Sequence, residues 1–313
     1  MNQRKKSPIK PFFLSKMAIG IVVFGITAIQ YSCSYFHPDE VVPGYIQIDT
    51  FSFQSQAPDS TGYPTQRISE VWLFANNQVL GVYSIPTGKI PVIAKGRTNI
   101  SIQAGVFTDG IRKNRVYYPF YRPFETLVEL EQGKVTTLTP HFSYTAQKKI
   151  PFTFYQDFEL SDSGCIKGDD GNVFIQMVLH GNTAKPALFG NRYAKLTTAS
   201  ATDVIEFSNN VTVPLPTNGN PVYLEFDYKS TCPILVGVNG FFGNNYFGSS
   251  SDLVLNPREE WTKIYVSLSE ETSKFNTEAI LKRTPARFRF FLKTVPEPGP
   301  GNSLSLDNIR LIN

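Results

Sequence analysis

The stretch "SLSLDNIRLIN" (Ser303 to Asn313) ends the chain and decides the interpretation of its second half. Leu304 and Leu306 alternate with polar residues, as in a strand with one buried face. After Asp307-Asn308 the apolar residues move to the opposite set of positions. A change of phase of this kind is typical of a β-bulge. The stretch therefore predicts a strand that is interrupted by a bulge.

The composition indicates β structure for the whole chain. The 313 residues include 25 Phe and 15 Tyr, with 22 Gly and 22 Pro that supply turns at short intervals. Aromatic and β-branched residues favour strands, whereas no segment has a long stripe of helical period. The best helical segment is "SEETSKFNTEAILKR" (Ser269 to Arg283). We therefore predict an all-β protein.

Two β-sandwich domains fit the length of the chain. The first, residues 45–146, begins with the alternating strand "YIQIDTFSF". We predict one hairpin that turns at Asn76-Asn77 and another that turns at Gln132-Gly133, because Asn and Gly accept the left-handed backbone of tight turns. This order resembles the small sandwiches, related to carboxypeptidase-regulatory and immunoglobulin-like domains, that begin many Bacteroidetes lipoproteins.

The second domain, residues 150–313, has a more specific pattern. It opens with "FTFYQDFEL", continues through "VYLEFDYKS", "EEWTKIYVSLS" and "ARFRFFLKT", and ends with the stretch quoted above. This succession resembles the galactose-binding-like jelly roll, the fold of many carbohydrate-binding modules. The resemblance implies that the opening strand pairs near the closing one, and that Trp261 belongs to the core. Trp72, in the hairpin of the first domain, is also predicted to be core.

A short apolar run near the start, Met17 to Ile29, follows five basic residues and no acidic one. It is shorter than the roughly 20 residues that a membrane-spanning helix needs, so residues 1–32 suit a signal peptide better than a short membrane anchor or a buried helix. Ser32-Cys33 resembles the end of a bacterial lipobox, although Gln30 and Tyr31 depart from its usual pattern. The resemblance implies acylation of Cys33, palmitate included, and residues 33–44 as a tether. It also implies a lipoprotein of the outer membrane. Asp39-Glu40 resembles a displaced form of the acidic signal that follows this cysteine in surface lipoproteins of Bacteroidetes, which implies that the protein faces the cell exterior.

Removal of the leader changes the charge balance. The whole chain has 30 Lys and Arg against 26 Asp and Glu, and five of these bases lie in the leader. The remaining chain is close to neutral, so it offers no general electrostatic surface for nucleic acid.

Three kinds of candidate site follow. The jelly-roll resemblance implies a structural calcium ion at Glu159 and Asp307, since such an ion takes carboxylate oxygens; capping and hydrogen bonding by these side chains is the alternative. A ring-rich loop in the second domain suits stacked sugars, or else packing between sheets, and contains Phe241, Phe242, Tyr246 and Phe247. A second ring cluster, which two prolines should hold extended, suits a protein interface and contains Tyr117, Tyr118, Phe120, Tyr121 and Arg122.

Covalent features are few. Cys165 and Cys232 are either a disulfide, which an envelope compartment permits, or two buried thiols. Asp59-Ser60-Thr61 matches a short bacterial O-glycosylation pattern at Ser60. No catalytic motif is present, and the carboxylates of Asp157, Glu159, Glu259 and Glu260 have no spacing that argues for glycoside hydrolysis.

The sequence thus favours a non-catalytic lipoprotein that docks on an integral β-barrel of the outer membrane, in barrel assembly, transport or secretion. The alternative is a surface glycan-binding lipoprotein.

Overall fold

The computed structural model describes residues 42–54, 63–94, 96–145, 152–159, 190, 192–200, 202–295 and 301–313, and the backbone alone of 165–167 and 173–179. The signal peptide, Cys33, the tether up to residue 41 and Ser60 lie outside these ranges. In the described part of the chain, no helix is long and apolar enough to cross a membrane.

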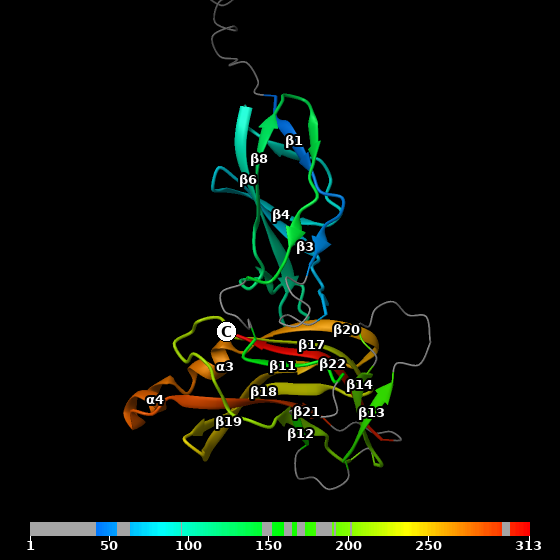
Figure 1. The fold of residues 1–313 in the computed structure, drawn as a ribbon, viewed down its shortest axis with the longest axis vertical. Helices are drawn as coiled ribbons and strands as arrows, with labels where there is room; N and C mark the ends of the chain where they lie inside the picture. The colour runs from blue at the N-terminus through cyan, green and yellow to red at the C-terminus, as the bar shows by residue number, and fades with distance from the viewer. Residues whose placement is uncertain are drawn as a thin grey trace, which may run out of the picture.

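Ten strands form the described part of the first domain (Figure 1): β1 (Gly44–Gln47), β2 (Ser52–Phe53), β3 (Glu70–Ala75), β4 (Gln78–Ser84), β5 (Ile90–Val92), β6 (Gly96–Phe107), β7 (Arg115–Tyr117), β8 (Phe124–Leu130), β9 (Val135–Thr137) and β10 (His141–Phe142). The main sheet has the order β4-β3-β6-β7, with β8 also paired to β6. Opposite it lie the three strands β5-β1-β9 and the pair β10-β2. Ile46, Val71, Leu73 and Ile102 are completely buried between these layers.

Two turn predictions had different outcomes. The β3–β4 hairpin is confirmed, since Asn76 and Asn77 both adopt positive φ angles, 48° and 64°. The hairpin predicted at Gln132-Gly133 is wrong. Gly133 does turn the chain, but β9 leaves β8 and pairs in parallel with β1. The pairing partner of such a short strand depends on the rest of the domain rather than on the local turn.

The second domain is a sandwich of two sheets. The facing sheet, which faces the first domain (Figure 1), has the order β13-β14-β22-β17-β20 with β11 on β22. Its strands are β11 (Phe154–Gln156), β13 (Val173–Leu179), β14 (Arg192–Thr198), β17 (Tyr223–Ser230), β20 (Arg258–Ser267) and β22 (Ser303–Ile312). The strands of the far sheet are β12 (Cys165–Lys167), β15 (Glu206–Asn209), β16 (Val213–Pro214), β18 (Ile234–Phe242), β19 (Asn245–Leu255) and β21 (Ala286–Thr294). Their order is β12-β15-β21-β18-β19, and β16 pairs with β21.

The closing strand confirms the bulge that its phase change predicts. Asn308 has a φ angle of 49°, and the register between β22 and β17 shifts opposite this point. Leu304 and Leu306 before the bulge, and Ile309 and Leu311 after it, all lie in the core of the second domain. The bulge therefore keeps both halves of the strand buried on the same side. The opening strand β11 pairs antiparallel with β22, as the resemblance implies.

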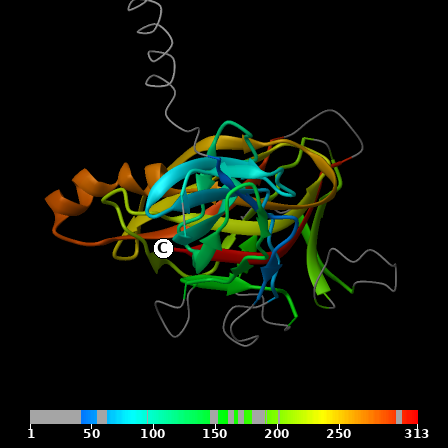
Figure 2. The ribbon, with the colours of Figure 1, turned by 90° about the horizontal axis from the view of Figure 1, so that it is seen from above.

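The helices of the described residues are short and follow β20. α3 (Ser269–Ser273) and α4 (Asn276–Lys282) occupy the one segment that the sequence favours as helical. They project to one side of the sandwich (Figure 2). The all-β fold class is confirmed.

Candidate functional site

The outer surface of the facing sheet is divided into a covered half and an open half. Each strand of this sheet sends alternate side chains toward the core and toward the first domain. In β17 the outward positions include Tyr223, Glu225 and Asp227, and in β20 they include Lys263 and Tyr265. The first domain stands over this half of the sheet (Figure 2), so these side chains are buried.

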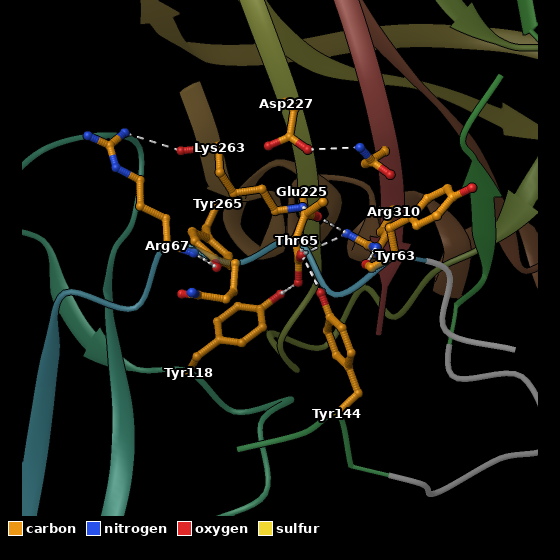
Figure 3. A network of polar contacts seen from close by, with 12 residues as sticks. Tyr63, Thr65, Arg67, Tyr118, Tyr144, Glu225, Asp227, Lys263, Tyr265 and Arg310 are labelled. Carbon is orange, nitrogen blue, oxygen red and sulfur yellow. Dashed lines mark hydrogen bonds and ion pairs between the residues drawn. The ribbon is translucent and has the colours of Figure 1, made fainter. Parts of the chain in front are cut away.

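A polar network fills the covered half (Figure 3). The Glu225 carboxylate accepts hydrogen bonds from the hydroxyls of Tyr118 (2.6 Å) and Tyr144 (2.7 Å), both from the first domain. The Lys263 ammonium lies 3.2 Å from the same carboxylate. Burial lowers the pKa of Lys263, and the nearby Arg310 lowers it further against the opposing effect of Glu225. Buried charges need partners, so these contacts favour one relative placement of the two domains.

Segment 63–67 of the first domain adds a second set of contacts (Figure 3). The Thr65 hydroxyl accepts hydrogen bonds from Lys263 (3.1 Å) and Arg310 (2.7 Å), and the Tyr63 carbonyl accepts another from Arg310. The Arg67 backbone N–H donates to the Tyr265 hydroxyl at 2.8 Å. This segment therefore lies directly on the facing sheet.

The open half of the sheet contains a groove, here called the sheet groove, of about 420 Å³. Its lining comes from four neighbouring strands and the turns next to them: Tyr193, Lys195, Lys229, Ser230, Thr231, Pro257, Arg258, Glu259, Trp261, Ser303 and Ser305. The half-buried rings of Tyr193 and Trp261 meet edge to face, with centroids 5.2 Å apart and planes at 89°. The Lys229 ammonium lies 5.4 Å from the Trp261 ring centroid.

This lining combines apolar rings with polar groups of several kinds. Hydroxyls, two ammonium groups, a guanidinium and a carboxylate surround the ring pair. A concave site with aromatic surface and a few oriented polar groups is the usual form of a small-ligand or oligosaccharide site.

Solved carbohydrate-binding modules are among the similar structures. A module called TmCBM61, in complex with β-1,4-galactotriose, is 14% identical over 50% of this chain and 94% of its own, with a TM-score of 0.31. A family 11 module of Clostridium thermocellum is 14% identical over 50% of this chain and 92% of its own, with a TM-score of 0.32. A structure from a study of modules of the β-sandwich superfamily is 14% identical over 88% of this chain and all of its own, with a TM-score of 0.34. No protein-family model and no curated protein matches the chain.

The prediction that Trp261 belongs to the core is wrong. The jelly-roll resemblance implies a core position, but the side chain lies on the outward face of β20 and lines the sheet groove. The sequence does contain a pattern that predicts this exposure. Ile264 and Val266, at the even positions of the strand, lie in the core, so Trp261 at an odd position faces outward. Trp72 is likewise half-buried and lies against Tyr117, with ring centroids 5.6 Å apart, rather than in the core.

The predicted interface cluster is only partly exposed. Tyr118 and Tyr121 are 2% and 4% exposed and pack against the second domain, while Tyr117 is 49% exposed. The extended conformation expected here is wrong, because the Tyr121 N–H donates to the Tyr118 carbonyl (3.2 Å) and the chain turns. The turn directs both rings to the same side, where they contact Tyr265. These two rings are therefore unavailable to an outside partner, whereas Arg122 remains exposed.

The ring-rich loop belongs to the far sheet. Phe242 is buried, and its ring meets Phe247 with centroids 5.2 Å apart. Tyr246 and Phe247 are 60% and 46% exposed, and Phe241 meets Tyr246 with centroids 5.7 Å apart. None of the four lines the sheet groove, so this loop and the groove are separate surfaces.

The proposed calcium pair lies where several carboxylates gather. Burial, the neighbouring Asp227 and, more weakly, Glu159 and Asp157 raise the pKa of Asp307 to about 9, against a backbone hydrogen bond from Asn308. The Glu159 carboxylate accepts the Arg192 N–H at 3.0 Å. It also occupies the space that a Cβ at position 190 would fill, which is why a glycine suits that position. In the described residues, no group of three or more His, Cys, Asp or Glu side chains could hold a metal ion, so calcium stays a prediction.

The cysteine pair also stays a prediction. Cys232 is fully buried, and its backbone N–H donates to the Ser230 hydroxyl. The side chain of Cys165 lies outside the described part of the structure.

Proposed function

We propose that this protein is a non-catalytic glycan-binding lipoprotein whose sugar site is the sheet groove. The observation that carries the proposal is the ring pair Tyr193 and Trp261 on the open half of the facing sheet, among hydroxyl and charged side chains. The C–H faces of a sugar stack on aromatic rings, and its hydroxyls need the hydrogen-bonding groups that surround this pair.

The groove is open along the sheet, which suits a chain of sugars better than a small enclosed ligand. Lining residues come from β14, β22, β17 and β20 in turn, so a glycan that lies across the strands would contact all four. The lipid on Cys33, which the leader sequence predicts, would hold the site at the outer membrane.

Docking on a β-barrel partner is less well supported. Two rings of the cluster predicted for that role, Tyr118 and Tyr121, are buried between the domains of the same molecule. The glycan-binding alternative therefore replaces it as the proposed function.

The test is retention of the full chain on immobilised polysaccharides: β-1,4-galactan, xylan, mixed-linkage β-glucan, polygalacturonate and heparin. Trp261→Ala should weaken retention on the bound polysaccharide by about 2 kcal/mol, roughly thirty-fold in Kd, as expected for a central aromatic contact. Trp72→Ala is the matched control, because the chain has two tryptophans and Trp72 lies in the first domain. Failure to retain any of the five polysaccharides, or equal retention of both variants, would contradict the proposal.

A further inference from the structure

The charges of the sheet groove differ in sign from those of the chain as a whole. Without residues 1–32 the chain has 25 basic and 26 acidic residues, because all five leader charges are basic. The groove, in contrast, is lined by Lys195, Lys229 and Arg258 against one carboxylate, that of Glu259. The groove therefore has a net positive charge, whereas the chain without these residues is close to neutral.

These cations are not used in ion pairs within the part of the chain that the structure describes. Arg258 interacts with the Tyr228 hydroxyl, and Lys229 lies over the Trp261 ring, but no carboxylate pairs with them there. Lys274 and Lys293, elsewhere in this domain, do pair with acidic side chains. A ligand that reaches the Trp261 ring would thus meet an ammonium group 5.4 Å from the ring centroid.

A second hollow of about 400 Å³ continues from the groove toward the first domain. Trp261 lines both hollows, and the second is also lined by Pro64, Thr65, Gln66, Arg67, Asp227, Thr262 and Lys263. Arg67 is exposed, and its guanidinium is held by a hydrogen bond from Nη1 to the Lys263 carbonyl at 3.2 Å. The first domain thus supplies one more cation at the end of the groove.

We infer that the sheet groove binds an acidic polysaccharide, whose carboxylate or sulfate groups meet Lys229 and Arg258 beside Trp261 and, further along the chain, Arg67 of the first domain. This inference rests on the proposed function and names its ligand class. Arg and Lys are suited to carboxylate and sulfate oxygens, and the rings provide the stacking that a sugar needs. The site is then composite, because the second domain alone lacks its last cation.

The experiment measures Kd of the full chain by calorimetry for polygalacturonate and heparin, and for the neutral polymers xylan and mixed-linkage β-glucan. The acidic polymers should bind at least tenfold more tightly. The double variant Lys229→Gln/Arg258→Gln should bind the acidic polymers at least tenfold more weakly. Its Kd should also depend less on salt concentration. Lys89→Gln/Lys113→Gln, which removes two exposed cations of the first domain, is the control and should stay within twofold.

Two further variants exclude misfolding as the explanation. Glu259→Gln removes the one carboxylate of the groove and should tighten acidic binding. Arg67→Gln should weaken the binding of long acidic chains and leave the binding of disaccharide fragments unchanged. Comparison of polygalacturonate with heparin shows whether carboxylate or sulfate is preferred.

The outcomes separate the two proposals. Equal or tighter binding of the neutral polymers would overturn the acidic ligand but leave glycan binding intact. Binding to none of the polymers would overturn both. Tighter binding to a single-stranded DNA oligomer or to phosphatidylglycerol vesicles would also overturn this inference, as would equal losses in the two double variants.

Discussion

The Tyr118 hydroxyl of the first domain donates a 2.6 Å hydrogen bond to the Glu225 carboxylate of the second. Both side chains are buried, so the bond forms in a region where a carboxylate without partners is costly. Tyr118→Phe removes this donor and keeps the ring. We expect a loss of about 2 kcal/mol in the free energy of unfolding, the usual value for a hydrogen bond to a charged group. Urea unfolding measures it.

Tyr117→Phe is the neighbouring control. This side chain is 49% exposed, and its loss of a hydroxyl should change stability by less than about 0.5 kcal/mol. Equal stability of the two variants would mean that the junction contributes little to the fold.

Alkaline pH should destabilise the junction. Burial raises the pKa values of Tyr118, Tyr121 and Tyr144 well above their usual value. Nearby acidic groups such as Glu225 raise them further, while Arg310 opposes the shift at Tyr144. In the unfolded chain a tyrosine loses its proton near pH 10, so above that pH the folded state binds more protons. The stability contribution is complete below about pH 10 and falls above it, by about 1.4 kcal/mol per pH unit for each such tyrosine.

The measurement is urea unfolding between about pH 10.5 and 11.5, above the usual pKa of lysine, because the lowered pKa of Lys263 has the opposite effect below it. Tyr121→Phe should reduce the slope of unfolding free energy against pH by the contribution of one tyrosine, about 1.4 kcal/mol per pH unit. Tyr246→Phe, at an exposed ring, should leave it unchanged. A slope that Tyr121→Phe does not alter would contradict this reading of the junction.

The calcium hypothesis predicts a lower melting temperature in chelator. If Glu159 and Asp307 hold an ion that binds the folded state alone, a hundredfold excess of the ion over its Kd stabilises by about 2.7 kcal/mol. The intact chain is the right sample, because removal of the first domain would expose the buried charges of Glu225, Lys263 and Arg310. Glu159→Gln should abolish the effect of chelator. An unmoved melting curve of the unaltered protein would exclude the metal.

Cys33→Ala tests the anchor. An unacylated precursor should no longer be held stably in the outer membrane, because the apolar run Met17 to Ile29 is too short to span a bilayer. Membrane fractionation with a Ser34→Ala control measures this. Unchanged fractionation of Cys33→Ala would return the anchoring role to the apolar run.

Local patterns in the sequence predicted the parts of the fold that neighbours along the chain determine. The bulge at Asp307-Asn308, the hairpin at Asn76-Asn77 and the helical segment from Ser269 each depend on a few adjacent residues. The parallel pairing of β9 with β1 joins segments some 90 residues apart, and no local signal identifies it.

The site was harder to predict for the same reason. Tyr118 and Tyr121 share a side only because the chain turns between them, and they are buried only because the second domain lies there. Glu225, Lys263 and Arg310 occupy outward positions of three strands, and this pattern of charges on a β surface indicates a covered polar face. Which half of the sheet is covered, and hence the exposure of Trp261, follows from the arrangement of the domains.

The fluorescence of Trp261 tests the glycan-binding groove most directly. Trp72→Phe leaves Trp261 as the one tryptophan in the chain, so its emission reports on the groove. Titration of this variant with the polysaccharide that retains the full chain should give a saturable change in emission, with the same Kd as calorimetry. Tight binding of the polysaccharide with no change in Trp261 emission would place the sugar elsewhere and contradict the account.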